Sequence, residues 1–353
     1  MNNKKWTLAC LLLTLFLLVL GALPTVIADP YVHYHKPLAQ MTLILNNQRY
    51  QNDGILKNFD YEAIVTGTSM TENFKTSEVD SLFDVDSVKV SYSGASFKEI
   101  ADSMNNAFRA NPNIHYVIRA IDCNRIIEHK DAMNYDVDMY PTYLYDWNPF
   151  NDVSYVLNKQ ILFEDTMRVW AYSRAGVPST TFDEYSYWAD DYEYGAEAVL
   201  KDYVRPEKLE TVWTVQPEEI FRLQESMIQN FISHAEKHPD TQFYYFFAPY
   251  SIYWWDSIHQ VGETERYIQL MEVASRMMVE YDNIHLFSFF DVENLICEPD
   301  HYKDTLHYSG EINSQILQWM KNGEHRLTRD NYKAHWDAMR EFYENYDYDA
   351  LFE

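Results

Sequence analysis

Five short runs of apolar, β-branched and aromatic residues recur along the chain, and amphipathic helical patterns separate most of them. A run of this kind, without a helical period, is typical of a strand buried on both faces of a sheet. Because strands that alternate with helices pair in parallel through right-handed crossovers, the pattern predicts an α/β domain with a parallel five-stranded sheet. The predicted strands are residues 61–66, 87–92, 114–121, 242–248 and 283–292, and the predicted helices begin near residues 76, 97, 217, 263 and 309.

The N-terminus carries two lysines, Lys4 and Lys5, followed by an uncharged, leucine-rich run from Trp6 to Ala28. This run is long enough to span a bilayer, which takes about 20 residues. The lysines before it predict that the N-terminus lies on the cytoplasmic side and the rest of the chain outside the cytoplasm. We expect residues 1–28 to be a retained signal anchor, with cleavage after Ala28 and secretion as the alternative.

The remaining chain is predicted to divide into three segments. Residues 29–58 form a polar and aromatic approach segment, residues 59–325 the α/β domain, and residues 326–353 a helical tail. Between about 122 and 216 the alternation of strands and helices stops, and the sequence is rich in Tyr, Asp, Asn, Trp and Pro. We interpret this stretch as an insertion at the carboxyl edge of the sheet, because it is too long for a plain loop. It is either a substrate-recognition lid or a stabilising cap.

The composition excludes one class of partner. With 54 acidic and 28 basic residues the net charge is −26, and an acidic surface repels the phosphate backbone of nucleic acids. The 29 Tyr, 19 Phe and 9 Trp suit either a sugar-binding surface or a large core. Cys123 and Cys297 are either a disulfide pair or two buried thiols. No spacing of Cys or His indicates a metal site, and we expect no cofactor.

Two motifs carry the groups needed for nucleophilic catalysis. Ser69 follows Gly67 directly after the first predicted strand, and Asp304 precedes His307 by three residues after the fifth. A serine nucleophile needs a base to take its proton, and the base needs a partner that fixes its tautomer. Since parallel strands share a carboxyl edge, all three side chains are expected to meet there. The alternative for Ser69 is an ordinary turn or helix-cap residue. A second pair in the same loop, Asp300 and His301, competes less well for the role of the base.

These motifs resemble those of the SGNH/GDSL hydrolase superfamily: Gly67-Thr68-Ser69, the Ser93-Gly94 turn after the second strand, and Asp304-Thr-Leu-His307. The resemblance spans roughly residues 61–320 and implies a three-layer, flavodoxin-like fold. It also implies that Ser69 is the nucleophile, His307 the base and Asp304 its orienting partner, with the backbone N–H groups of Ser69 and Gly94 facing the oxyanion. The family's Gly-x-Asn-Asp block falls near residues 120–124 and is altered. Asn124 is the candidate for its third oxyanion donor, and an Asp122 carboxylate beside it would repel an oxyanion.

The anchored layout resembles membrane-bound, cell-surface members of this superfamily, such as the D-alanine transfer protein of teichoic-acid modification and alginate acetyltransferases. It implies an extracytoplasmic serine esterase or O-acyltransferase that acts through an acyl-Ser69 intermediate on an acylated, most plausibly O-acetylated, cell-surface glycan or teichoic-acid-like polymer. A membrane-bound O-acyltransferase is an implied partner. The altered oxyanion block keeps a second hypothesis open, a non-catalytic glycan-binding or assembly subunit with the same fold. Trp254 and Trp255 are candidates for stacking on a sugar ring, with core packing as the alternative.

Overall fold

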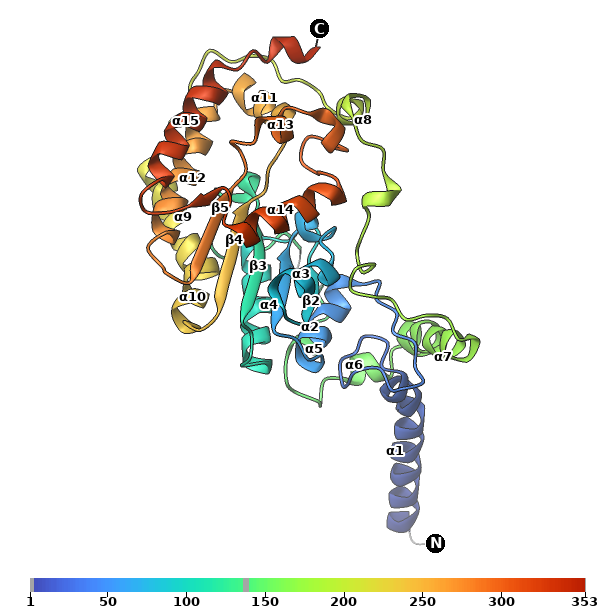
Figure 1. The fold of residues 1–353 in the computed structure, drawn as a ribbon. Helices are drawn as coiled ribbons and strands as arrows, with labels where there is room; N and C mark the ends of the chain where they lie inside the picture. The colour runs from blue at the N-terminus through green and yellow to red at the C-terminus, as the bar shows by residue number, and fades with distance from the viewer. Residues whose placement is uncertain (1–2, 136–139, 353) are drawn as a thin grey trace. The chain divides into compact units, whose positions relative to one another are not determined.

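The computed structural model describes residues 3–135 and 140–352. The start of the N-terminal segment, four residues of the expected insertion and the last residue of the tail therefore lie outside the described residues. The described chain contains a mixed six-stranded sheet with the order β2-β1-β3-β4-β5-β6 (Figure 1). The strands are β1 (Ala63–Gly67), β2 (Ser87–Ser91), β3 (Tyr116–Ile121), β4 (Gln242–Phe247), β5 (Ile284–Ser288) and β6 (Arg326–Leu327).

The first five strands pair in parallel, as the sequence predicts, and the two-residue β6 adds an antiparallel edge beside β5. Every residue of β1 and β2 is buried, although β2 alternates polar and apolar residues. The predicted five-stranded sheet is therefore one strand short, because β6 is too short to produce a strand pattern in the sequence.

The strand order determines which face of the sheet each connecting helix covers. The step from β1 to β2 runs in the opposite direction to the step from β2 to β3. Right-handed crossovers therefore put the connecting helices α3 (Thr76–Phe83) and α4 (Phe97–Ala110) on opposite faces, which gives three layers. On the first face α3 packs against α14 (Gly310–Asn322).

On the second face α4 packs beside the long helix from residue 217 to residue 237. That helix is made of α9 (Pro217–Met227), a π-helical turn (Ile228–Ile232) and α10 (Ser233–Lys237). The same layer contains α12 (Thr264–Met278), which packs against both α9 and α15 (Tyr332–Asn345), the helix of the tail. A further helix, α11 (Ile252–Gln260), follows β4 and was not predicted.

The chain divides into two compact units, and the division differs from the expected one. The sheet unit consists of Tyr61–Asn134 and Phe182–Glu353, and the N-terminal unit of Met1–Asp60 and Tyr135–Thr181. The expected insertion at 122–216 is thus split: its middle part joins the N-terminal unit, and residues 182–216 belong to the sheet unit. Which unit a segment joins depends on contacts between distant residues, and composition alone does not encode those contacts.

The N-terminal unit begins with α1 (Asn3–Ala28), which among the described residues is the one helix long and apolar enough to cross a membrane. The approach segment contains α2 (Gln48–Asn58), which was not predicted. The remaining helices of this unit are α5 (Thr142–Tyr145), α6 (Val153–Val156), a π-helical turn (Ile161–Asp165) and α7 (Thr166–Ala175). The segment from α6 to α7 packs against α1.

Candidate active site

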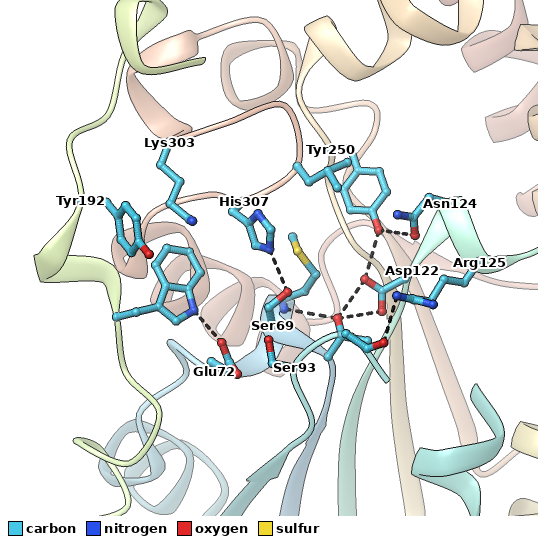
Figure 2. A pocket seen from close by; sticks show the side chains of 15 residues that line it. Ser69, Glu72, Ser93, Asp122, Asn124, Arg125, Tyr192, Tyr250, Lys303 and His307 are labelled. Carbon is cyan, nitrogen blue, oxygen red and sulfur yellow. Dashed lines mark hydrogen bonds between the residues drawn. The ribbon is translucent and has the colours of Figure 1, made fainter. Parts of the chain in front are cut away.

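Ser69 lies at the carboxyl end of β1, in the turn that leaves the strand. Gly67 ends β1 with φ of +149°, and a Cβ atom there would lie 2.7 Å from the methyl group of Thr71. The position therefore needs glycine, both for its backbone angle and for space. A short 3₁₀ turn, Ser69–Thr71, follows at once, and Thr68 caps it by accepting a hydrogen bond from the Met70 N–H. The turn holds the Ser69 side chain out from the sheet edge, in a pocket of about 420 Å³ (Figure 2).

The structure brings Ser69, His307 and Asp304 together, as their placement after β1 and β5 predicts. Ser69 Oγ lies 2.8 Å from His307 Nε2 (Figure 2). On the other side of the ring, His307 Nδ1 lies 2.8 Å from Asp304 Oδ2 and 3.0 Å from Asp304 Oδ1. With the proton on Nδ1, the ring donates to Asp304 and its Nε2 is free to accept the serine proton.

Asp304 is held in place and kept ionised by several donors. Its Oδ1 also accepts the backbone N–H groups of Leu306 and His307, both at 2.8 Å. Burial on its own would raise the pKa of Asp304, but the hydrogen bond from His307, the charge of that ring and the two backbone N–H groups outweigh burial. Together they lower the pKa of Asp304 to about 2. The Asp-x-x-His loop therefore supplies an ionised carboxylate to one ring nitrogen of His307 and leaves the other for Ser69.

Two backbone donors are available beside the Ser69 hydroxyl. Within the part of the chain that the structure describes, the N–H groups of Ser69 and Gly94 donate no hydrogen bond, and both residues line the pocket. Gly94 has φ of +68°, a conformation that favours glycine. Its carbonyl oxygen accepts from Arg125 at 3.1 Å and from Asn134 at 2.8 Å, which fixes the orientation of the turn. These are the two donors that the sequence motif predicts for an oxyanion.

Asp122 and Asn124 line the same pocket at the end of β3. The Asp122 carboxyl is buried and accepts from the hydroxyl groups of Thr68 and Tyr250, each at 3.0 Å. Burial raises the pKa of Asp122, while the charge of Arg125 and the hydrogen bonds from Thr68 and Tyr250 act in the opposite direction. Tyr250 also lies 3.1 Å from Asn124 Oδ1. The Tyr250 hydroxyl has one proton, which the Asp122 and Asn124 oxygens share.

One wall of the pocket comes from the segment after residue 182, within the expected insertion, and its individual residues were not predicted. Trp188 contacts His307 edge-on, with ring centroids 5.6 Å apart, and its indole N–H donates to Glu72 at 2.8 Å. The backbone N–H groups of Trp188 and Ala189 both donate to Asn73 Oδ1, at 3.0 and 3.1 Å. Since Glu72 and Asn73 follow the serine turn directly, this wall is bound to the same short loop as Ser69.

Two lysines support this arrangement. Lys303 places its ammonium group 3.9 Å from the centre of the Tyr192 ring and 4.6 Å from that of Trp188, at the side of the pocket shown in Figure 2. Lys89 on β2 is fully buried and donates to the carbonyl oxygens of Glu72 and Asp183. Burial lowers the pKa of Lys89 to about 7. The sequence shows Lys89 only as a polar residue in an alternating strand, and nothing local reveals its role in joining the two segments.

The prediction for Trp254 and Trp255 is wrong. Both lie on α11, with exposed fractions of 7% and 0%, and Trp255 stacks on Tyr343 with centroids 3.9 Å apart. A ring that is covered on its face by another ring cannot stack on a sugar. The alternative reading, core packing, is the correct one.

The competing base lies away from the pocket. In the described chain, His307 lines the pocket and His301 and Asp300 do not.

The two cysteines outside α1 are not paired. Cys123 is buried, Cys297 is partly buried, and both are free thiols, so the disulfide alternative does not hold in this structure.

Neither a comparison with models of known protein families nor a search of curated proteins finds a match to this chain.

Proposed function

We propose that the chain is a serine esterase or O-acyltransferase that works through an acyl-Ser69 intermediate. The observation that carries the proposal is a pair of contacts on the His307 ring. Ser69 Oγ lies 2.8 Å from His307 Nε2, and Asp304 Oδ2 lies 2.8 Å from His307 Nδ1. In the first half-reaction His307 Nε2 takes the proton of Ser69 as its oxygen attacks the ester carbonyl. The tetrahedral oxyanion is stabilised by the N–H groups of Ser69 and Gly94 and by the Asn124 amide.

The intermediate then collapses, and His307 donates its proton to the departing alcohol, which leaves an ester between the acyl group and Ser69. In the second half-reaction water or a sugar hydroxyl attacks this ester, and His307 takes the proton of the attacking group. The proton returns to Ser69 Oγ as the bond to the acyl group breaks. Attack by water gives hydrolysis, and attack by a sugar hydroxyl gives acyl transfer.

The fold supports this proposal. The order of the first five strands, 2-1-3-4-5, is that of flavodoxin-like sheets, in which sites lie at the carboxyl ends of the strands. Ser69 and Asn124 follow β1 and β3, the neighbouring strands at which this order reverses direction. This placement agrees with a member of the SGNH/GDSL superfamily, whose motifs the sequence resembles.

The proposed substrate is an O-acylated cell-surface glycan or teichoic-acid-like polymer, with acetyl as the proposed acyl group. The pocket combines aromatic rings, Trp188 and Tyr192, with charged and hydroxyl groups, which suits a sugar ring next to a short acyl ester. The apolar helix α1 supports a membrane-anchored protein with its catalytic unit outside the cytoplasm. A membrane-bound O-acyltransferase that supplies or accepts the acyl group is the proposed partner.

The experiment that tests the proposal is hydrolysis of a chromogenic acetyl ester by the wild type and by Ser69→Ala. We expect the variant to lose turnover and keep its thermal unfolding temperature. Ser81→Ala, which changes an exposed serine on α3, is the matched control and should retain full activity. Equal turnover by Ser69→Ala and the wild type would refute the assignment.

The second candidate is a non-catalytic glycan-binding or assembly subunit. The observation that favours it is the altered Gly-x-Asn-Asp block, which places the Asp122 carboxyl in the same pocket as the proposed oxyanion donors. A fluorophosphonate probe separates the two functions. Labelling of Ser69 supports the enzyme, and binding of a glycan without any labelling supports the subunit.

A further inference from the structure

The length of α1 fixes which part of the N-terminal unit lies at the level of a membrane. Lys4 and Lys5 precede the apolar run, and 20 residues from Trp6 reach Thr25. At 1.5 Å per residue these 20 residues span about 30 Å, the thickness of the hydrocarbon core. The described residues of the helix are exposed up to Leu20. From Gly21 onward they are partly or fully buried, except Leu23, which is 47% exposed. One side of the last turns of the span is therefore covered by protein at a depth where the bilayer still surrounds the helix.

The segment that covers these turns runs from α6 to α7. A Cβ atom on Gly21 would lie 3.9 Å from the Leu157 side chain, just after α6. The hydroxyl of Thr166, the first residue of α7, donates to the hydroxyl of Thr25 at 3.2 Å. Two independent contacts thus put this segment level with residues 21–25 of α1, at the outer end of the predicted span (Figure 1).

The exposed surface of this segment near Thr166 is apolar. Phe163, Met167 and Trp170 follow a helical spacing of four and three residues, so they share one face, and Phe163 and Met167 are 66% and 52% exposed. Both lie within one helical turn of Thr166. Just before α6, Phe150 is 91% exposed. Large apolar side chains on a polar, acidic protein are normally scattered, so this grouping indicates a binding surface.

Basic residues occur in the same segment. They are Lys159, Arg168 and Arg174, against Glu164 and Asp165 as its acidic residues, in a chain whose net charge is −26. Arg168 lies 3.6 Å from the Asp165 carboxylate. Exposed aromatic and apolar side chains with neighbouring basic groups are typical of helices that lie in the membrane interface.

We propose that the face of Phe163, Met167 and Trp170, together with the exposed Phe150 and the 55% exposed Val153 of α6, is seated in the lipid of the outer leaflet beside α1. The inference rests on the part of the proposed function in which α1 spans the membrane. Its occupant is the bilayer interface, with the aromatic and apolar side chains among the upper acyl chains and the basic side chains at the headgroup phosphates. The N-terminal unit is then held to the membrane at two places, the span and this face.

The test uses three forms of the full chain in phosphatidylcholine vesicles, each with one environment-sensitive fluorophore on its one accessible cysteine. All carry Cys297→Ser and keep Cys123, which is fully buried and closed to the label. The positions are the native Cys10, which lies on the exposed surface of α1, and F163C and F221C, both combined with Cys10→Ala. Phe221 on α9 is 61% exposed and serves as the matched control, because it belongs to the sheet unit and not to the proposed face. Nitroxide-bearing phosphatidylcholine quenches from the lipid, and iodide quenches from water.

We expect the label at F163C to show blue-shifted emission, quenching by the nitroxide lipid and protection from iodide, as at Cys10. The label at F221C should show the reverse. If the label at Cys10 is quenched by the lipid while the label at F163C responds like that at F221C, α1 spans the membrane but the face does not contact lipid, and the inference is refuted. If F163C is protected from iodide but not quenched by the lipid, a second copy covers the face and the inference also fails. If Cys10 itself is open to iodide, the membrane span is wrong, and the inference falls with it.

Discussion

Replacing Asp304 with asparagine is expected to reverse the hydrogen bond between Ser69 and His307, so that the ring donates to the serine hydroxyl and no longer accepts from it. In the wild type Asp304 Oδ1 accepts two backbone N–H groups at 2.8 Å, while Oδ2 faces His307 Nδ1. An asparagine must keep its oxygen toward the two backbone donors, because an amide NH₂ there would oppose them. Its NH₂ group then faces His307 Nδ1 and donates to it.

The consequence is a change of tautomer. With Nδ1 as the acceptor, the His307 proton moves to Nε2, which then donates to Ser69 Oγ and cannot take its proton. In serine proteases, replacing the triad aspartate with asparagine produces the wrong histidine tautomer and lowers kcat by about 10⁴. We expect a loss of that order for Asp304→Asn, which corresponds to about 5.5 kcal/mol of transition-state stabilisation.

The assay compares kcat on a chromogenic acetyl ester for the wild type, Asp304→Asn and the matched control Asp300→Asn, which changes an exposed carboxylate in the same loop. Nuclear magnetic resonance of ¹⁵N-labelled histidine reports which ring nitrogen carries the proton, a readout that a purely structural role would not move. A variant Asp304→Asn that keeps its proton on Nδ1, or that retains activity within tenfold of the wild type, would refute the reasoning.

Three further predictions follow from the same pocket. Asn124→Ala removes the third proposed oxyanion donor and should lower kcat by about 10²–10³ with little change in KM; an unchanged kcat in steady-state assays would exclude Asn124 from the oxyanion site. Trp188→Phe removes a hydrogen bond to the Glu72 carboxylate and should lower the free energy of unfolding by about 1.5–3 kcal/mol, measured by denaturant titration; equal stability of the two proteins would contradict this role. The pKa of Asp304 is lowered in the folded protein from 3.8 to about 2, so its contribution to stability is complete above pH 3.8 and is lost as the pH falls toward 2. Acid unfolding of the wild type and Asp304→Asn should therefore converge across this window, and a constant difference between them would contradict the pKa shift.

The contact between Ser69 and His307 could be anticipated because it depends on topology. Each residue follows a strand with a clear apolar run, and parallel strands bring their carboxyl ends to one edge. The position of Asp304 beside His307 was equally predictable, since a spacing of three residues is a local property of the sequence. The sequence pattern does not settle their chemical roles, which stay predictions.

The wall opposite the oxyanion donors could not be predicted in the same way. Trp188 reaches Glu72 across 116 residues of sequence, and Lys89 reaches Asp183 across 94. No periodic pattern reports such contacts, because they depend on how a long irregular segment returns to the sheet.

The error at Trp254 and Trp255 has a related cause. Tryptophan suits both a sugar site and a core, and for Trp255 the stacking partner Tyr343 in the tail helix decides between them. Trp254 is instead packed among Tyr250, Trp255 and Tyr267. The tail, to which the sequence assigned no role, therefore covers one of the two rings that were expected to face a substrate.

The most direct test of the central claim is reaction of the intact protein with a fluorophosphonate, followed by mass spectrometry of its peptides. A serine activated by His307 should form a covalent phosphonyl adduct at Ser69, and prior unfolding or His307→Ala should abolish it. Labelling that occurs at other serines to the same extent, or the absence of any adduct at Ser69 in the folded wild type, would contradict the account.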